Sequence, residues 1–114
     1  MNIVYGIKNC DTVKKARAWL DAQQIPYQFH DFRTDGLSES QVNDWIKTLG
    51  LDQLINKRST TWKSLDDATK NALSGESAAA VITAHPTLIK RPLLQTGSQL
   101  RVGFSASNYQ ELFQ

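Results

Sequence analysis

Short apolar runs and one helical repeat alternate over the first third of the chain. Residues 3–5 are apolar and rich in β-branched side chains, and Gly6 closes this run, which predicts a buried strand. Apolar positions then recur at helical spacing over residues 11 to about 24 and predict a helix of about four turns. Aromatic and polar residues alternate over 27–32, which predicts a second strand. This order of elements indicates a right-handed parallel βαβ unit.

The middle of the chain carries only helical patterns. Ser38, followed three residues later by Gln41, makes a capping box ahead of an apolar stripe that ends at Gly50. Helical patches of weaker periodicity follow over residues 51–55, 65–73 and 77–85. The polar stretch 57–61 lies between the first two patches, and we predict an ordered loop there.

The last quarter of the chain predicts a hairpin and a helix. Residues 93–94 begin an apolar run, Gly97 and Ser98 predict a turn, and apolar residues alternate with Arg101 over 100–102. This pattern is typical of an antiparallel hairpin. A short helix is predicted over 107–113, and the whole chain is therefore expected to form an α/β fold.

The composition describes one domain over residues 1–114. Of the 114 residues 40% are hydrophobic, and a chain of this length holds its fold with a single core. The 13 Lys and Arg nearly balance the 11 Asp and Glu, and no basic run predicts direct contact with nucleic acid. No window is long and apolar enough for a membrane span, and no secretory signal begins the chain. We therefore expect a cytoplasmic protein, and we expect it to be a monomer.

Cys10 is the single cysteine and the first candidate for chemistry. It follows the first predicted strand at the start of the first helix, where free backbone N–H groups and the helix dipole stabilise a thiolate. Lys8 would assist this effect and Asp11 would oppose it. The alternative is that Cys10 is a small apolar residue that fills space in the core. No metal site is predicted, because His30 and His85 lie far from each other and from Cys10 in the sequence.

Asp11 and Thr12 have a structural alternative to any role in binding. Acidic and hydroxyl side chains at a helix start accept hydrogen bonds from the first backbone N–H groups. We interpret Asp11 as such a cap. For Thr12, capping and the binding of an anion or a sulfur atom explain the residue equally well.

Arg58 and Arg91 differ from cations on an ordinary solvated helix face. Arg58 lies in a polar stretch, and Arg91 directly precedes Pro92. A guanidinium group binds carboxylates and oxyanions through paired hydrogen bonds and would stabilise a nearby thiolate. If both arginines converged on Cys10, they would form a thiol site with an anion pocket. Taken alone, an arginine in such a position is more often a surface charge.

The histidines and tryptophans have structural explanations. Neither His30 nor His85 has a sequence neighbour that indicates a general base, and we interpret both as structural or exposed. Trp19, Trp45 and Trp62 are interpreted as core packing rather than as stacking platforms for bases.

Four stretches of the sequence carry a family resemblance over almost the whole chain. They are Tyr5-Gly6-Ile7-Lys8-Asn9-Cys10-Asp11-Thr12-Val13-Lys14-Lys15-Ala16, Asn56-Lys57-Arg58, His85-Pro86-Thr87-Leu88-Ile89-Lys90-Arg91-Pro92 and Val102-Gly103-Phe104. The pattern resembles the arsenate reductase (ArsC) family, more closely its small YffB-like branch, which is similar in turn to the Spx transcription regulators. The resemblance implies a thioredoxin-like fold with a mixed four-stranded sheet, a central helical insertion over about 38–86, and a cis bond before Pro92.

The resemblance also implies a reaction. In arsenate reductases of this family a nucleophilic cysteine works with three arginines, attacks the oxyanion, and passes the adduct to glutathione and glutaredoxin. Cys10 matches the nucleophile, and Arg58 and Arg91 match two of the arginines. The third arginine position falls on Phe104, and Arg101 lies three residues earlier, an offset that places it on the other face of a strand. We therefore expect a glutathione-dependent monothiol reductase.

In this expectation Lys8, Thr12, Arg58, Arg91 and Pro92 bind the substrate or glutathione, whose two carboxylates suit two arginines. Glutathione or another small thiol is the expected partner, with glutaredoxin as a further one. No metal is expected.

Two other functions stay open. Many Spx-like regulators carry a second cysteine three residues after the first, but this chain has Val13 there, which excludes a Cys-x-x-Cys switch. A binding protein that docks on the RNA polymerase α-subunit without catalysis is one alternative. A true arsenate reductase is the third choice, and Phe104 argues against it.

Overall fold

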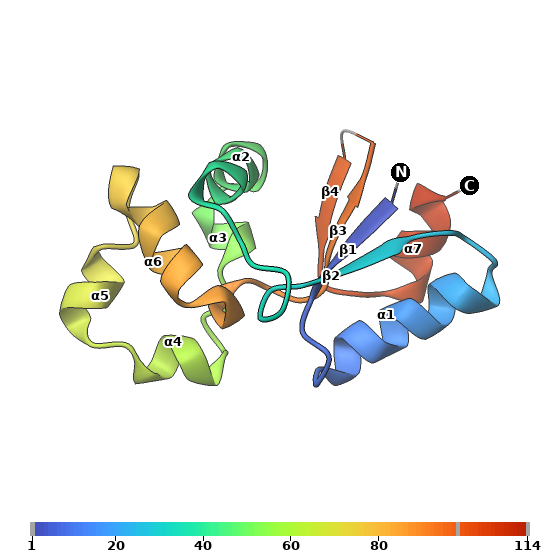
Figure 1. Cartoon of the computed structure of the whole chain (residues 1–114), viewed down its shortest axis with the longest axis horizontal. Helices are drawn as coiled ribbons and strands as arrows, with labels where there is room; N and C mark the ends of the chain where they lie inside the picture. Colours follow the sequence, from blue (N-terminus) through green and yellow to red (C-terminus); the bar gives the residue numbers. More distant parts are fainter. Residues whose placement is uncertain (1, 98, 114) are drawn as a thin grey trace. The chain divides into compact units, whose positions relative to one another are not determined.

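The structure is a computed structural model that describes residues 2–97 and 99–113. The chain divides into two compact units (Figure 1). The first unit consists of Met1–Asp35 and Arg91–Gln114, and the second consists of Gly36–Lys90. The second unit therefore interrupts the sequence of the first.

The first unit is built on a mixed four-stranded sheet. Its strands are β1 (Asn2–Gly6), β2 (Gln28–Asp31), β3 (Leu93–Thr96) and β4 (Gln99–Val102). Their spatial order is β2-β1-β3-β4, in which β1 and β2 are parallel, while β3 is antiparallel to both β1 and β4. The parallel strand pair and the antiparallel hairpin are confirmed. Of the predicted turn residues between β3 and β4, Ser98 lies outside the described residues.

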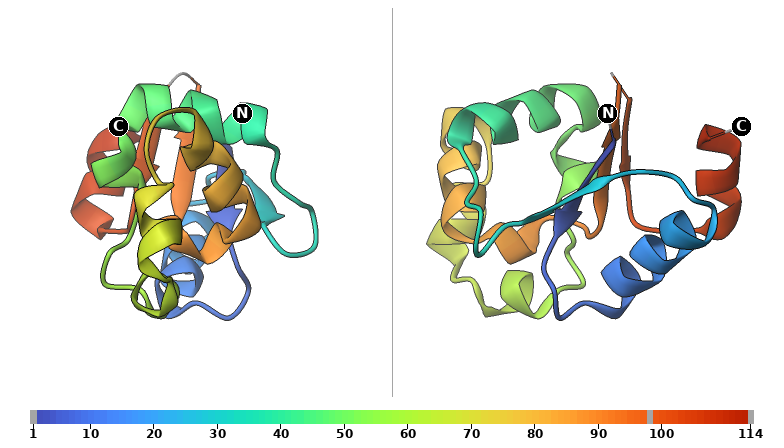
Figure 2. Two further views of the ribbon diagram at one scale, coloured as in Figure 1. Left: turned by 90° about the vertical axis from the view of Figure 1, so that its left-hand side faces the viewer. Right: turned by 45° about the vertical axis from the view of Figure 1, so that its right-hand side comes forward.

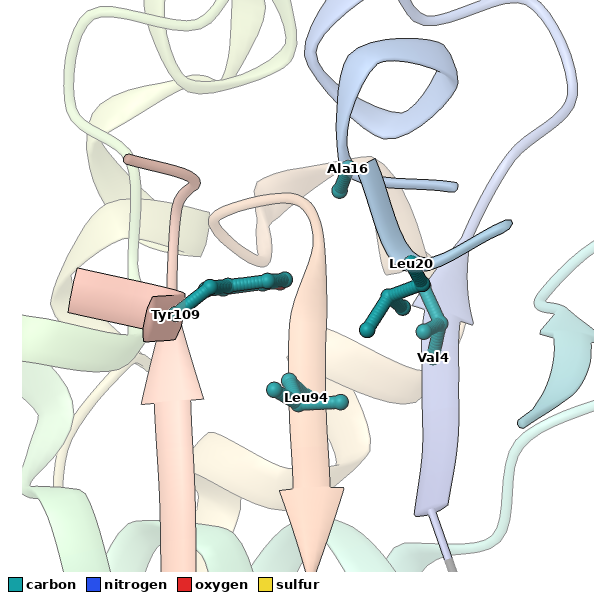
Figure 3. Packing of buried hydrophobic residues seen from close by; sticks show 5 residues of the cluster. All are labelled: Val4, Ala16, Leu20, Leu94 and Tyr109. Atoms are coloured by element: carbon teal, nitrogen blue, oxygen red, sulfur yellow. The ribbon is translucent and has the colours of Figure 1, made fainter. Parts of the chain in front are cut away.

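Two helices, α1 (Asp11–Ala22) and α7 (Ala106–Leu112), cover one face of this sheet (Figure 2). Figure 3 shows their side chains meeting those of the two central strands. The fully buried members of this core are Val4, Ala16, Leu20, Leu94 and Tyr109. The apolar residues whose helical spacing predicted α1 are therefore the residues that α1 buries against the sheet.

Helix α1 ends earlier than the pattern predicts. Its last residue is Ala22, and Gln24 adopts the left-handed conformation with a φ of 57°. The backbone N–H of Ile25 then donates to the carbonyl of Leu20 at 3.0 Å, which reverses the chain toward β2. The prediction overran because glutamine favours helices and gives no stop signal of its own.

Helix α2 (Glu39–Leu49) opens the second unit and confirms Ser38 as its N-cap, one half of the predicted capping box. The Ser38 Oγ accepts a hydrogen bond from the backbone N–H of Gln41 at 3.2 Å. Gly50, with a φ of 83°, ends the helix as predicted. Helix α2 packs against α6 (Ala78–Ala84), the longest of the later helices in this unit.

The other helices of the second unit are short. They are α3 (Leu51–Leu54), α5 (Asp67–Asn71), and the 3-10 helices η1 (Gly75–Ser77) and η2 (Pro86–Leu88). Fully buried side chains of the unit are Val42, Leu54, Ile82 and Leu88. Within residues 2–97 and 99–113, no helix is long and apolar enough to cross a bilayer.

Two predictions for this unit are wrong in part. The loop predicted over 57–61 ends at Ser59, and α4 (Thr60–Ser64) begins there because the Ser59 Oγ accepts from the backbone N–H of Trp62 at 3.1 Å. The unit is also not purely helical, since Ile55 and Ile89 form an antiparallel β-bridge. Local periodicity does not reveal a pairing between residues so far apart in sequence.

Candidate functional site

Cys10 lies where the sequence predicts, between β1 and α1. It is the N-cap residue of α1, with extended backbone angles (φ −135°, ψ 120°), and its carbonyl accepts from the backbone N–H of Lys14 at 2.9 Å. The residue is free of disulfides and half-buried rather than part of the core. Cys10 therefore begins the helix as a partly exposed residue.

The N-terminus of α1 has no side-chain cap, which corrects the interpretation of Asp11. Because Cys10 is the N-cap residue, Asp11 and Thr12 are the first and second helical residues and come too late to cap the helix. Other helices of this chain begin with a side chain that accepts a backbone hydrogen bond, namely α2, α4, α5 and α7. The first backbone N–H groups of α1 thus lie beside a sulfur atom, without a capping oxygen from the described residues.

Arg91 and Pro92 lie at the same edge of the sheet as the segment that leads to Cys10. The Arg91–Pro92 peptide bond is cis, as expected, and the Pro92 carbonyl accepts from the backbone N–H of Gly103 at 2.9 Å. Strand β3 starts at the next residue, and its Leu93 pairs with Tyr5 of the antiparallel strand β1. The start of β3 therefore lies beside the end of β1.

The predicted site residues of the first unit share this edge. Lys8 is exposed in the loop after β1, while Thr12 and Arg91 are half-buried and Pro92 is buried. The fold thus places four predicted binding residues at the sheet edge from which α1 begins. Their contacts with a ligand stay a prediction.

Arg58 belongs to the second unit and lies in an ordered turn. The Asn56 Oδ1 accepts from the backbone N–H of Arg58 at 3.0 Å, and the Ser59 Oγ donates to the Asn56 carbonyl at 2.7 Å. These bonds confirm an ordered loop for this part of the chain. The Arg58 side chain is exposed, and its convergence on Cys10 stays a prediction.

Trp62 is the feature that sequence reasoning missed. Trp45 is buried, and Trp19 packs edge-on against Tyr109 with ring centroids 5.8 Å apart, so both are confirmed as packing residues. Trp62 is only half-buried, and the Nζ atoms of Lys57 and Lys70 lie over its ring. No spacing pattern in the sequence indicates this cluster, because the two lysines come from different local segments.

The described residues include no group of three His, Cys, Asp or Glu side chains placed to hold a metal ion. His30 is half-buried, with its ring centroid 4.9 Å from that of Tyr5. His85 is half-buried after α6.

Comparison with known proteins gives the family. The model of the ArsC family matches residues 5–112 of the chain. The chain belongs to the ArsC family. An uncharacterised protein of Haemophilus influenzae is 46% identical over 113 residues, which cover 99% of each chain. The solved structure of a YffB protein is 38% identical, has a TM-score of 0.91 and covers 97% of each chain.

The relatives of this ArsC-family chain include transcription regulators. The global transcriptional regulator Spx of Lactiplantibacillus plantarum is 30% identical over 107 residues, which cover 92% of this chain and 80% of the regulator. The family resemblance and the α/β thioredoxin-like fold are thereby confirmed. Val13, which stands where many Spx-like regulators have a second cysteine, is fully buried.

As an ArsC-family member, the chain departs from the three-arginine pattern at Phe104. The Phe104 ring contacts the Tyr109 ring edge-on, with centroids 4.8 Å apart, and packs against the core of the first unit. Arg101 is exposed on β4 and bonds locally, because its Nη1 donates to the Leu100 carbonyl at 3.0 Å and its Nη2 to Gln99 Oε1 at 2.9 Å. An apolar packing residue thus stands at the position expected for a third arginine.

Proposed function

We propose that this ArsC-family protein is a glutathione-dependent monothiol reductase with Cys10 as its nucleophile. The observation that carries the proposal is the placement of the single cysteine at the uncapped N-terminus of α1. The positive end of the helix and its free N–H groups stabilise a thiolate, which is the reactive form of cysteine. The negative charge of Asp11, next to Cys10, acts against the thiolate. The positive charge of Lys8, two residues before Cys10, favours it.

The proposed reaction has two exchange steps. The Cys10 thiolate attacks the glutathionyl sulfur of a glutathione mixed disulfide, the S–S bond breaks, and the substrate leaves as a thiolate that takes up a proton. A second glutathione, as its thiolate, then attacks the sulfur that is bound to Cys10. Glutathione disulfide leaves and the Cys10 thiolate returns. In the net reaction the mixed disulfide is reduced to the substrate thiol, one glutathione thiol is oxidised, and its sulfur joins the glutathionyl group already in the mixed disulfide as glutathione disulfide.

The anionic partner needs cationic groups near the thiol. In this proposal Arg91 binds one glutathione carboxylate, while Lys8, Thr12 and Pro92 line the same sheet edge. Arg58 is proposed for the second carboxylate on the strength of the family pattern. Guanidinium groups suit this role because they form two parallel hydrogen bonds to a carboxylate. A cytoplasmic location is proposed with it, because a reducing compartment supplies the second glutathione.

A second function has its own support in the Spx relative. A protein that docks on the RNA polymerase α-subunit without catalysis would use the same fold and would not need the thiol. A pull-down with the C-terminal domain of that subunit, carried out with wild type and with Cys10→Ser, separates the two functions. Equal binding of wild type and Cys10→Ser to this domain favours the docking function over the reductase.

The deciding experiment is the pH dependence of Cys10 alkylation, with and without glutathione. We expect rapid alkylation at neutral pH, protection by glutathione, and one glutathione adduct by intact mass after exposure to glutathione disulfide. Arg91→Gln should lose the protection, while the matched control Arg33→Gln, an exposed arginine of the same unit, should keep it. A slow thiol that forms no adduct would rule out the reductase.

A further inference from the structure

The turn at Lys57 and the helices α4 and α5 that follow it carry two cations beside an indole ring. We call this set the Trp62 cluster and define it as Lys57, Trp62 and Lys70. The Nζ of Lys57 lies 5.6 Å and that of Lys70 lies 5.2 Å from the ring centroid. Both distances are within the range of cation–π attraction. All three residues belong to the second unit.

The two ammonium groups have no acidic partner in the part of the chain that the structure describes. No carboxylate within residues 2–97 and 99–113 lies at ion-pair distance from Lys57 or Lys70. The acidic residue nearest to Lys57 in sequence is Asp52, and those nearest to Lys70 are Asp67 and Asp66. Asp66 is engaged as the cap of α5, where its Oδ1 accepts from the backbone N–H of Thr69 at 2.7 Å. Hydrogen bonds from Thr69 hold the pKa of Asp66 below its ordinary value.

The indole ring adds an apolar surface and a free donor. Trp62 is half-buried, and its Nε1–H makes no hydrogen bond to any described residue. Lys63, next to it on α4, is exposed and adds a third positive charge. Tryptophan is among the residues that most often dominate binding energy in protein interfaces, and the lysines beside it supply positive charge.

We propose that the Trp62 cluster is a docking surface for an acidic segment of a protein partner. Carboxylates of the segment would pair with the ammonium groups of Lys57 and Lys70 and accept from the Trp62 Nε1–H, while its apolar atoms would cover the indole. Charge complementarity selects this occupant. A nucleic acid fits less well, because the whole chain carries a net charge of only +2, which gives little attraction for a phosphate backbone.

The test uses the full chain and a labelled peptide of glutamate and glycine, with a peptide that has glutamine in place of every glutamate as its control. Fluorescence anisotropy should show binding of the acidic peptide alone, and binding should weaken as salt is raised. The double variant Lys57→Gln with Lys70→Gln should weaken binding roughly tenfold, since each exposed ion pair contributes up to about 1 kcal/mol. Lys47→Gln, an exposed lysine on α2 of the same unit, should leave it unchanged.

Two further arms make the test decisive. Trp62→Ala should weaken binding at least as much as the double lysine variant, and circular dichroism must show that each variant keeps its helices. A labelled single-stranded oligothymidylate is the competing probe. The proposal is overturned if wild type does not bind the acidic peptide, if Lys47→Gln weakens binding as much as the double variant, or if the oligothymidylate binds more tightly through the same residues.

Discussion

Gly6 and Val13 are in direct contact where β1 meets α1. A methyl group at Gly6 would lie 2.8 Å from Cγ2 of Val13, which is closer than carbon atoms approach one another in proteins. Val13 is fully buried, so it has no solvent into which to move. The absence of a side chain at Gly6 therefore allows the strand to lie against the first turn of the helix that starts at Cys10.

Gly6→Ala tests this contact directly. The backbone of Gly6 does not have a positive φ, so alanine causes no backbone strain there and the effect is steric. We expect a loss of about 1–3 kcal/mol in the free energy of unfolding, measured by urea denaturation. In the Val13→Ala background the same substitution should cost much less. Equal costs in the two backgrounds would show that the contact does not limit packing.

The Tyr109 hydroxyl is expected to lower the stability of the protein, so that its removal should be neutral or stabilising. It is buried without a hydrogen-bond partner in the part of the chain that the structure describes. Removing an unsatisfied polar group is neutral or stabilising, so Tyr109→Phe should raise the free energy of unfolding by up to about 1 kcal/mol. Tyr27→Phe is the matched control, because the Tyr27 hydroxyl accepts from Arg17 Nε at 3.1 Å and its loss should destabilise. A destabilised Tyr109→Phe variant would reveal a partner such as a bound water.

The same hydroxyl predicts sensitivity to alkaline pH. Burial raises the pKa of Tyr109 well above its ordinary value of 10.0. In the unfolded chain the hydroxyl ionises near its ordinary pKa, so the stability linked to Tyr109 is complete below about pH 10 and is lost as the pH rises further. Between about pH 8 and about pH 11, the free energy of unfolding measured in urea should therefore fall more steeply for wild type than for Tyr109→Phe. Parallel curves for the two proteins would contradict this linkage.

Arsenate turnover should be absent or very slow in wild type. Phe104 packs against Tyr109 where the family pattern would place a third arginine, so one cation for a developing oxyanion charge is missing. A glutathione-coupled assay should show reduction of a glutathione mixed disulfide and little reduction of arsenate. Phe104→Leu, which keeps an apolar side chain, should not change that ratio. Rapid arsenate reduction by wild type would show that another residue supplies the charge.

Hydrophobic periodicity and capping residues predict the helices and strands that form through short-range interactions along the chain. The parallel strand pair, α1 and the capping box at Ser38 follow from periodicity and from one hydrogen bond across three residues. The cap at Ser59 was missed because no apolar stripe follows it. The bridge between Ile55 and Ile89 was missed because it depends on tertiary folding alone.

The candidate site shows the same limit. The place of Cys10 at the start of α1 could be predicted, because one strand and one helix fix it. The capping role given to Asp11 was wrong by a single residue of helix register, which periodicity does not resolve. The cluster around Trp62 combines a lysine from a turn with a lysine from helix α5, and no spacing rule connects them.

The uncapped start of α1 implies a conflict between stability and reactivity at one residue. Serine begins α2, α4 and α7 and accepts a backbone hydrogen bond in each case, and the backbone angles of Cys10 are close to those of Ser105. Cys10→Ser should therefore supply the missing cap and raise the free energy of unfolding by about 0.5–1 kcal/mol, as urea denaturation would show. A variant of unchanged or lower stability would contradict this. The thiol at this position then costs stability that a hydroxyl would supply, and the proposed chemistry of Cys10 is the property that a hydroxyl could not replace.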